Sequence, residues 1–318
     1  MSETPSLSEI ETAARALAKV LPRTPCVRSK TTGIEWKPIS LKLETFQPVG
    51  SFKIRGILHC VAAMTDAERQ RGLLTVSAGN TAQALAWAGR HFGVRAESVM
   101  PETAPSNKIE AVHRLGGTTR LMPMHEVFRF MKEELWTDEP SAFVHPWTDT
   151  DVACGHGSLG LEILTDVPDV DSVYVPVGGG GLLAGVGAAL KASRPEVRVV
   201  AVEPEGCPSF TRSLAAGHPV EVDCNTICDG VAVPYTTEQM FPILRELCDE
   251  TMLVSEVNVR SAVRRLALED KVVAEPAGAL ALAAALEDAP ERRGHAVCIV
   301  TGGSIDGGQL ADILRGVS

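Results

Sequence analysis

Apolar and polar positions along this chain follow two periods, one typical of strands and one typical of helices. A helix is expected near the start, because Ser6 and Glu9 have capping-box spacing and helically spaced apolar residues follow as far as Pro22. Strands are expected at residues 39–43, 73–77, 98–101, 119–122, 142–145, 172–177, 197–202, 252–254 and 296–301. Helical patterns between them include residues 81–92, 107–115, 159–164, 257–268 and 277–286.

This alternation predicts an α/β protein whose mostly parallel sheets are covered by helices on both faces. The strands are too many for one compact sheet, so we expect two lobes. The small one would comprise residues 72–148, and the large one residues 1–71 together with 149–318. Ligands of such sheets bind at the carboxyl ends of the strands.

Composition narrows the class of protein. Of 318 residues, 45% are hydrophobic and 22% are charged, which is ordinary for a globular enzyme. The net charge of -10 disfavours a nucleic-acid partner. No apolar run is long enough for a membrane span, so no membrane partner is expected. The polar residues 1–4 do not resemble a secretory signal, and we expect a cytoplasmic protein.

The eight cysteines are scattered, and no two are spaced as CxxC. Cys224 and Cys228 have neither a second pair nor a histidine close by, so no zinc site is expected. We expect reduced and mostly buried thiols.

Two segments together predict a cofactor. Lys53 lies among the apolar residues Phe52, Ile54 and Ile57, and burial would lower its pKa, as a nucleophilic amine requires. The run Gly178, Gly179, Gly180 and Gly181 separates a strand pattern from a buried helical pattern that begins at Leu182.

Taken singly, these segments could be an exposed lysine and a flexible linker. A glycine turn before a helix, however, offers free N–H groups that cradle a phosphate. The molecule that needs both an amine for its aldehyde and a cradle for its phosphate is pyridoxal 5'-phosphate.

Further motifs extend this interpretation. In order they are KLETFQPVGSFKIRG, SAGNTAQALA, MPETAPSNKIEAV, HPWTDTDVACGHGSLGLEIL, PVGGGGLLAG, VEP, DGVAV, EPAGALA and VTGGSID. From residue 21 to residue 315 the chain resembles the fold-type II pyridoxal phosphate enzymes, and within them the serine/threonine dehydratase (ammonia-lyase) and serine racemase group. The resemblance implies a tryptophan synthase β-like fold and a homodimer.

The resemblance also implies roles for individual residues. Lys53 would form the Schiff base and take the α-proton of the substrate. Phe52 would pack on the cofactor ring, unless it is plain core. The residues expected to bind the phosphate are Gly178, Gly179, Gly180, Gly181 and Leu182, and those expected at the substrate carboxylate are Ser77, Ala78, Gly79, Asn80 and Thr81.

Three further residues would face the cofactor. Asn80 would hydrogen-bond its phenolic oxygen, and Thr301 would lie against its pyridine nitrogen. A hydroxyl there does not force that nitrogen to be protonated, which suits β-elimination. Glu275 would either tune protons in the cleft or serve only as a favourable carboxylate in the first turn of a helix.

The chain departs from the family pattern at several positions. Ala78 replaces the serine that racemases use as a second base, so efficient racemisation is not expected. Thr81 stands where dehydratases usually carry a histidine, which keeps a replacement reaction open. Trp147 stands where a smaller aromatic residue is more usual. It is either a core or lobe-interface residue or part of a pocket reshaped for a larger β-substituent.

The family's divalent-cation site uses a glutamate, a backbone carbonyl and an aspartate. The matching positions here are Glu203, Cys207 and Ser209. Because a hard cation prefers carboxylates to hydroxyls, a divalent ion, a monovalent ion or none is left open.

The expected function is that of an ammonia-lyase (dehydratase) acting on a β-hydroxy amino acid. The substrate would be of the L-threonine or L-serine type, or bulkier, such as phenylserine or hydroxyaspartate, and the products a 2-keto acid and ammonia. Since the chain ends at Ser318, we expect no regulatory domain and no isoleucine feedback. The alternatives are a β-replacement enzyme or synthase, a racemase, or a non-catalytic nucleotide- or amino-acid-binding protein.

Overall fold

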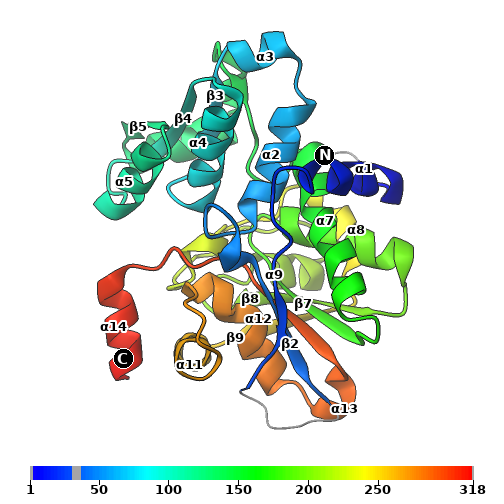
Figure 1. Ribbon diagram of the computed structural model, residues 1–318. Helices are drawn as coiled ribbons and strands as arrows, with labels where there is room; N and C mark the ends of the chain where they lie inside the picture. Colours follow the sequence, from blue (N-terminus) through cyan, green and yellow to red (C-terminus); the bar gives the residue numbers. More distant parts are fainter. Residues whose placement is uncertain (1–2, 31–36, 317–318) are drawn as a thin grey trace.

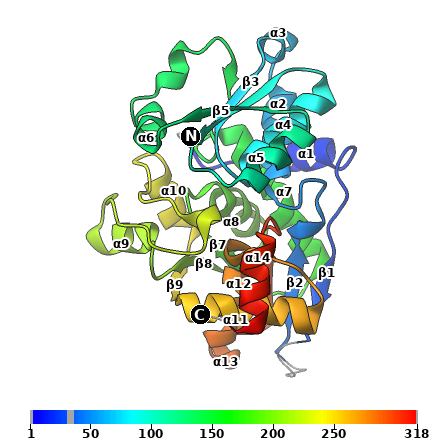
Figure 2. The same cartoon turned by 90° about the vertical axis from the view of Figure 1, so that its left-hand side faces the viewer.

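The computed structural model describes residues 3–30 and 37–316. The chain forms two sheets, which lie one above the other in Figure 1 and remain so after a quarter turn in Figure 2. Each sheet is mostly or wholly parallel and is flanked by helices. The predicted α/β class is therefore confirmed.

The smaller sheet has four parallel strands in the order β5-β4-β3-β6. Val99 packs toward α6 and Met100 toward α4 and α5, so successive residues of one strand are covered on opposite faces. The strands are β3 (Leu73–Val76), β4 (Ala96–Pro101), β5 (Thr118–Met122) and β6 (Ala142–Phe143). The helices are α4 (Asn80–Phe92), α5 (Ser106–Arg114) and α6 (Met124–Lys132), followed by the 3-10 turn η2 (Leu135–Asp138).

The larger sheet has the order β1-β2-β10-β7-β8-β9, and only the edge strand β1 runs antiparallel to its neighbour. Val173 and Val175 face one layer of helices, and Tyr174 faces the other. The strands are β1 (Cys26–Arg28), β2 (Ile39–Leu43), β7 (Ser172–Pro176), β8 (Arg198–Pro204), β9 (Glu250–Val254) and β10 (Ala296–Val300).

Helices cover both faces of this larger sheet. One layer contains α1 (Leu7–Leu17), α7 (Thr150–Asp166), α8 (Gly181–Ser193) and α10 (Met240–Leu247). The other contains α11 (Glu256–Arg265), the π-helical turn η4 (Leu266–Asp270), α12 (Pro276–Glu287) and α14 (Gly307–Arg315). The remaining elements are η1 (Glu44–Phe46), α2 (Lys53–Ala63), α3 (Asp66–Gln70), α9 (Ser209–Ala216), η3 (Asp229–Val231) and α13 (Pro290–Arg293).

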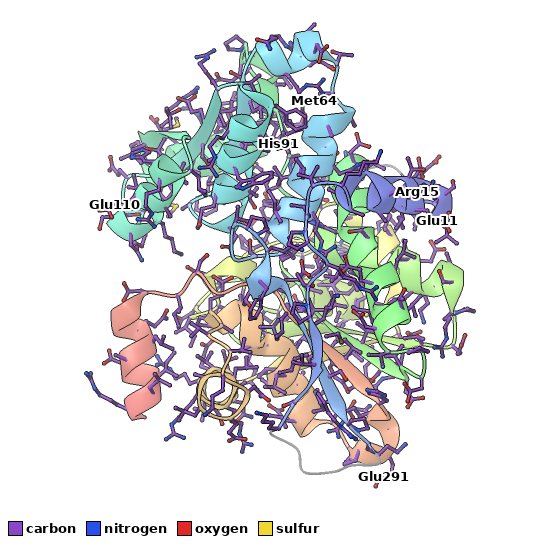
Figure 3. All side chains as sticks on the ribbon, viewed as in Figure 1. Glu11, Arg15, Met64, His91, Glu110 and Glu291 are labelled. Carbon is purple, nitrogen blue, oxygen red and sulfur yellow. A yellow bond between two sulfur atoms is a disulfide. The ribbon has the colours of Figure 1, made fainter. Side chains whose placement is uncertain are left out.

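The first predicted helix forms with its predicted cap. The side chain of Ser6 accepts from the N–H of Glu9, and the Glu9 carboxylate accepts from the N–H of Ser6. The helix ends at Leu17, so Val20 lies outside it and is 40% exposed. Figure 3 shows Glu11 and Arg15 on the outer side of this helix, directed away from the sheets.

The helix predicted at residues 159–164 proves much longer. It is α7, which begins at Thr150 because the Asp149 side chain accepts from two backbone N–H groups of its first turn. Glycines obscured its helical pattern in the sequence. They are present because of close packing: a Cβ on Gly155 would lie 2.4 Å from the carbonyl oxygen of Arg55 in α2.

No helix within the described ranges is both long enough and apolar enough to cross a lipid bilayer.

Candidate active site

A cavity of about 270 Å³ lies between the two halves of the molecule and is lined by residues from both. Its wall includes the loop that follows β3 and the loop that follows β7, and both loops lie at the carboxyl ends of parallel strands. Every residue predicted to bind cofactor or substrate lines it: Phe52, Lys53, Ser77, Ala78, Gly79, Asn80, Thr81, Gly178, Gly179, Gly180, Gly181, Leu182, Glu275 and Thr301.

Lys53 is the first residue of α2, and its Nζ lies 5.1 Å from the centre of the Phe52 ring. Burial lowers the pKa of Lys53 to about 8, although nearby Glu275 opposes this change. The backbone N–H of Phe52 donates to the carbonyl oxygen of Thr301 at 3.0 Å. This bond joins the lysine segment to the end of β10, so Lys53 and Thr301 lie at one cavity wall.

Glu275 stands just before α12 and is buried. Its Oε1 accepts from Nδ2 of Asn80 at 2.7 Å, which joins the start of α12 to the start of α4 on the other sheet. Burial, together with the charge of Asp229, raises the pKa of Glu275 to about 7. Glu275 is therefore a carboxyl group that can hold or release a proton near neutral pH.

The glycine run has the geometry of a phosphate cradle. Gly180 has a φ of +90°, which strongly favours glycine, and α8 begins at the next residue. A Cβ on Gly179 would lie 2.4 Å from Cγ of Trp147, and one on Gly178 would lie 2.9 Å from Cα of Val231. The first N–H groups of α8 lack partners within the helix, and the residues that carry them, Gly181 and Leu182, line the cavity.

The loop after β3 combines backbone and side-chain hydrogen-bonding groups. The N–H of Gly79 donates to Oγ of Ser77 at 3.1 Å, and α4 begins at Asn80. Oδ1 of Asn80 is buried without a hydrogen-bond partner among the described residues. The lysine of lowered pKa and the glycine cradle both fit pyridoxal phosphate, whereas the Nδ2 donor of Asn80 is already bound to Glu275.

Trp147 lines this cavity and also a neighbouring one of about 680 Å³. Its ring stands edge-on to the ring of His145, with the centroids 5.0 Å apart. Nδ1 of His145 accepts from the N–H groups of Trp147 and Thr148, and burial lowers the His145 pKa to about 4. Trp147 is therefore a wall between two cavities, held in place by a neutral histidine.

The cation positions lie apart from this cavity. Glu203 is buried, and its carboxylate accepts from the N–H groups of Phe210 and Thr211 and from the Thr211 hydroxyl. Those bonds cap α9 and use both carboxylate oxygens of Glu203. Ser209 begins that helix. In residues 3–30 and 37–316, no three His, Cys, Asp or Glu side chains gather in a way that could hold a metal.

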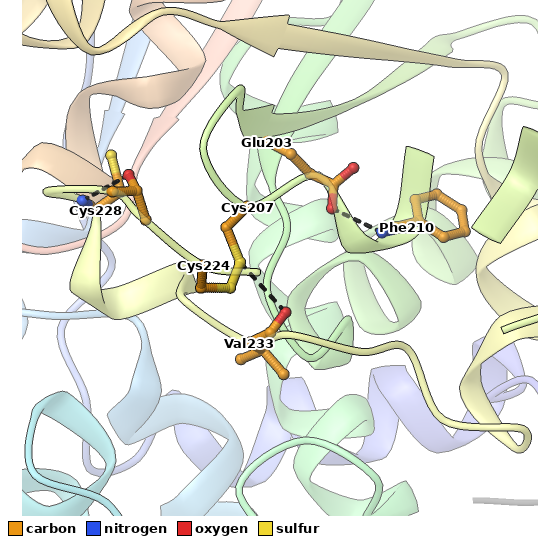
Figure 4. Close-up of a disulfide and its surroundings, with 7 residues drawn as sticks. Glu203, Cys207, Phe210, Cys224, Cys228 and Val233 are labelled. Carbon is orange, nitrogen blue, oxygen red and sulfur yellow. Dashed lines mark hydrogen bonds between the residues drawn. A yellow bond between two sulfur atoms is a disulfide. The ribbon is translucent and has the colours of Figure 1, made fainter. Parts of the chain in front are cut away.

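The expectation that all cysteines are reduced is wrong for Cys207 and Cys224, which form a disulfide (Figure 4). The two lie 17 residues apart and meet because the loop after β8 pairs with the segment before η3. There the N–H of Asn225 donates to the carbonyl oxygen of Gly206 at 2.8 Å. The other six cysteines are free, and four of them, Cys60, Cys154, Cys228 and Cys298, are buried as expected.

Two charged residues at the cavity were not given roles from the sequence. Lys108 and Asp229 both line it and form an ion pair with each other. Each lies within a motif quoted for the resemblance, but neither motif indicates that the two side chains meet.

The site can now be compared with known proteins. The family described as pyridoxal-phosphate dependent enzyme matches residues 17–302. This chain belongs to that family. The predicted cofactor is thereby confirmed. The resemblance to the serine/threonine dehydratase and serine racemase group is confirmed by relatives that carry those names.

Three of its relatives cover nearly all of the chain. It is 38% identical to the L-threonine ammonia-lyase of Thermotoga maritima, with 98% of this chain and 78% of the relative covered. It is 35% identical to the catabolic L-threonine dehydratase of Staphylococcus aureus, over 98% and 92%. The structure of maize serine racemase matches with a TM-score of 0.91 and 32% identity, over 99% and 98%.

Proposed function

We propose that this protein is a pyridoxal phosphate-dependent ammonia-lyase for a β-hydroxy amino acid of the L-threonine or L-serine type. Its products would be a 2-keto acid and ammonia, formed by α,β-elimination. The observation that carries the proposal is Lys53, an amine of lowered pKa at a cavity shared with a glycine cradle and a loop suited to a carboxylate. The names of the relatives, threonine ammonia-lyase and threonine dehydratase, support the same reaction.

Each residue has a distinct task in this proposal. The cofactor, when bound, supplies the electron sink that makes the α-proton of an amino acid acidic. The N–H groups from Gly178 to Leu182 would hold the phosphate. Lys53 would hold the cofactor through Nζ, and its amine would take the proton from Cα of the substrate.

Other residues orient the substrate and set the outcome. The N–H groups and hydroxyls of the loop from Ser77 to Thr81 bind the substrate carboxylate. Ala78 has no hydroxyl to return a proton from the opposite face, which favours elimination over racemisation. Asn80 and Glu275 hold the start of α4 against the start of α12, so the substrate loop faces Lys53.

The proposal extends to the organisation of the molecule. Residues 72–148 would form the small domain, since the whole four-stranded sheet falls within them. We also propose a cytoplasmic homodimer, as the family resemblance implies. Size-exclusion chromatography with light scattering would measure the mass directly, and a monomer at micromolar concentration would contradict the dimer.

The proposal is tested by keto-acid release from stereoisomers of serine, threonine, hydroxyaspartate and phenylserine, with the visible spectrum of the holoenzyme recorded. Rapid release from L-threonine or L-serine is expected. If a coloured holoenzyme stays inactive across the panel but forms a substituted amino acid when a thiol is added, the replacement reaction is correct instead.

The lowered pKa of Lys53 predicts how the apoprotein captures its cofactor. The neutral fraction of this amine rises with pH through about 8, whereas a free lysine has a pKa of ~10.4. The capture rate should therefore rise with pH and level off above about 8. It is measured as the growth of visible absorbance after mixing, with Nα-acetyl-lysine amide as the control. A rate that keeps rising with the control up to pH ~10 would contradict a buried, perturbed amine.

A further inference from the structure

Lys108 and Asp229 approach each other from the two halves of the molecule. Lys108 lies in α5 beside the four-stranded sheet, and Asp229 begins η3 beside the six-stranded one. Their side chains form an ion pair at the cavity, with exposed fractions of 20% for Lys108 and 54% for Asp229. The pair therefore lies at the boundary between the cavity and solvent.

The charges around the cavity balance. Among the described residues that line it, the charged types are Lys53, Lys108, Asp229 and Glu275. Lys53 is committed to the cofactor under the proposed function, and Glu275 accepts from Asn80. Among the described residues that line the cavity, Lys108 is therefore the cation that could bind an acidic group on a substrate side chain. Lys108 is already paired with Asp229.

This ion pair should affect the binding of neutral and acidic substrates differently. A carboxylate at Cβ would have to displace Asp229 from Lys108, so that one charge contact is lost for each one gained. It would also enter a cavity where Asp229 adds negative charge. A substrate with a hydrogen or a methyl group at Cβ does not have to displace Asp229. The discrimination would arise from like-charge repulsion rather than from a new attractive contact.

We propose that Asp229 is a specificity-determining residue. By engaging Lys108, it excludes amino acids that carry a carboxylate at Cβ and reserves the site for substrates with a small uncharged β-substituent. The inference rests on the proposed function, and it narrows the substrate from β-hydroxy amino acids in general to the threonine and serine type. Hydroxyaspartate, one of the candidates raised by the sequence, would be rejected.

The test is Asp229→Asn, which keeps the shape of the side chain and removes its charge. L-Aspartate and L-asparagine are the probes, because they differ mainly in charge and neither has a hydroxyl at Cβ to eliminate. Their binding to the holoenzyme is followed through its visible spectrum. The variant should bind L-aspartate at least about fivefold more tightly, the size of one partly exposed charge contact, whereas L-asparagine binding should change by less than about twofold.

Two further measurements sharpen the result. Adding Lys108→Gln to the variant should abolish the gain for L-aspartate, because the freed cation is then gone. The ratio of kcat/KM for 3-hydroxyaspartate over that for threonine should rise in Asp229→Asn by a similar factor. Asp229→Ser serves as a second variant if Asp229→Asn fails to fold, as judged by thermal melting and cofactor absorbance.

Contrary outcomes are distinct. If both probes bind more tightly by the same factor, the ion pair only covers the cavity, and the specificity role is wrong. An unchanged L-aspartate affinity would overturn it as well. The binding ratio does not depend on elimination, so a wild-type holoenzyme that releases no keto acid would refute the proposed function without deciding the role of Asp229.

Discussion

Lys53→Ala is expected to lower kcat/KM for keto-acid release by at least ~10³-fold, because the variant loses both the amine that holds the cofactor and the base that takes the α-proton. The visible absorption of the protein after addition of pyridoxal phosphate should be lost as well. Both are measured on purified protein, the first with the substrate that the panel identifies.

Lys19→Ala is the matched control, since Lys19 is exposed beyond the end of α1. That variant should keep its colour and its rate. If Lys53→Ala retained more than about a tenth of the wild-type turnover, another residue would have to be the base, and Lys53 would be reduced to a holder of the cofactor.

Arg55→Met is expected to destabilise the protein by about 3–5 kcal/mol, because it leaves a buried carboxylate without its partner. Arg55 is 2% exposed, and its guanidinium binds Glu44 at 2.7 and 2.9 Å and Glu162 at 2.7 and 2.9 Å. Glu44 is fully buried, and within residues 3–30 and 37–316 its carboxylate keeps only the bond from the hydroxyl of Thr24, at 2.6 Å, once Arg55 is gone.

This effect is measured as the free energy of unfolding in urea, and the double variant Arg55→Met/Glu44→Gln is its control. Because the double variant has no orphaned charge at Glu44, it should recover a large part of the loss. A loss in Arg55→Met below about 1 kcal/mol, or no recovery in the double variant, would show that the ion pairs add little. The network bears on function because α2, which Arg55 ties to η1 and α7, begins with Lys53.

Much of the site was predictable because its requirements are local. A lysine among apolar neighbours and a glycine run between a strand and a helix are visible within a few residues of sequence. The strands of the core were also found, since the buried parallel strands at residues 172–176 and 296–300 are continuous apolar runs. Helices were predicted less well where glycines interrupt the pattern, as in α7.

What escaped prediction depends on contacts between distant parts of the chain. Lys108 and Asp229 are 121 residues apart, and Asn80 and Glu275 are 195 apart. Each contact joins a helix beside the four-stranded sheet to a segment beside the six-stranded sheet, and no periodic pattern specifies how two sheets sit against each other.

The sequence by itself therefore predicted the α/β class from its periodicity and the cofactor from the lysine segment and the glycine run, since these follow from local backbone geometry and side-chain chemistry. The other residues named for the cavity came from the resemblance to a known family. Only the tertiary structure decided which charges meet there, that Cys207 bonds to Cys224, and that Glu203 caps a helix. The physical reason is that such pairings depend on the relative positions of whole elements, which are set by the packing of both sheets and their helices together.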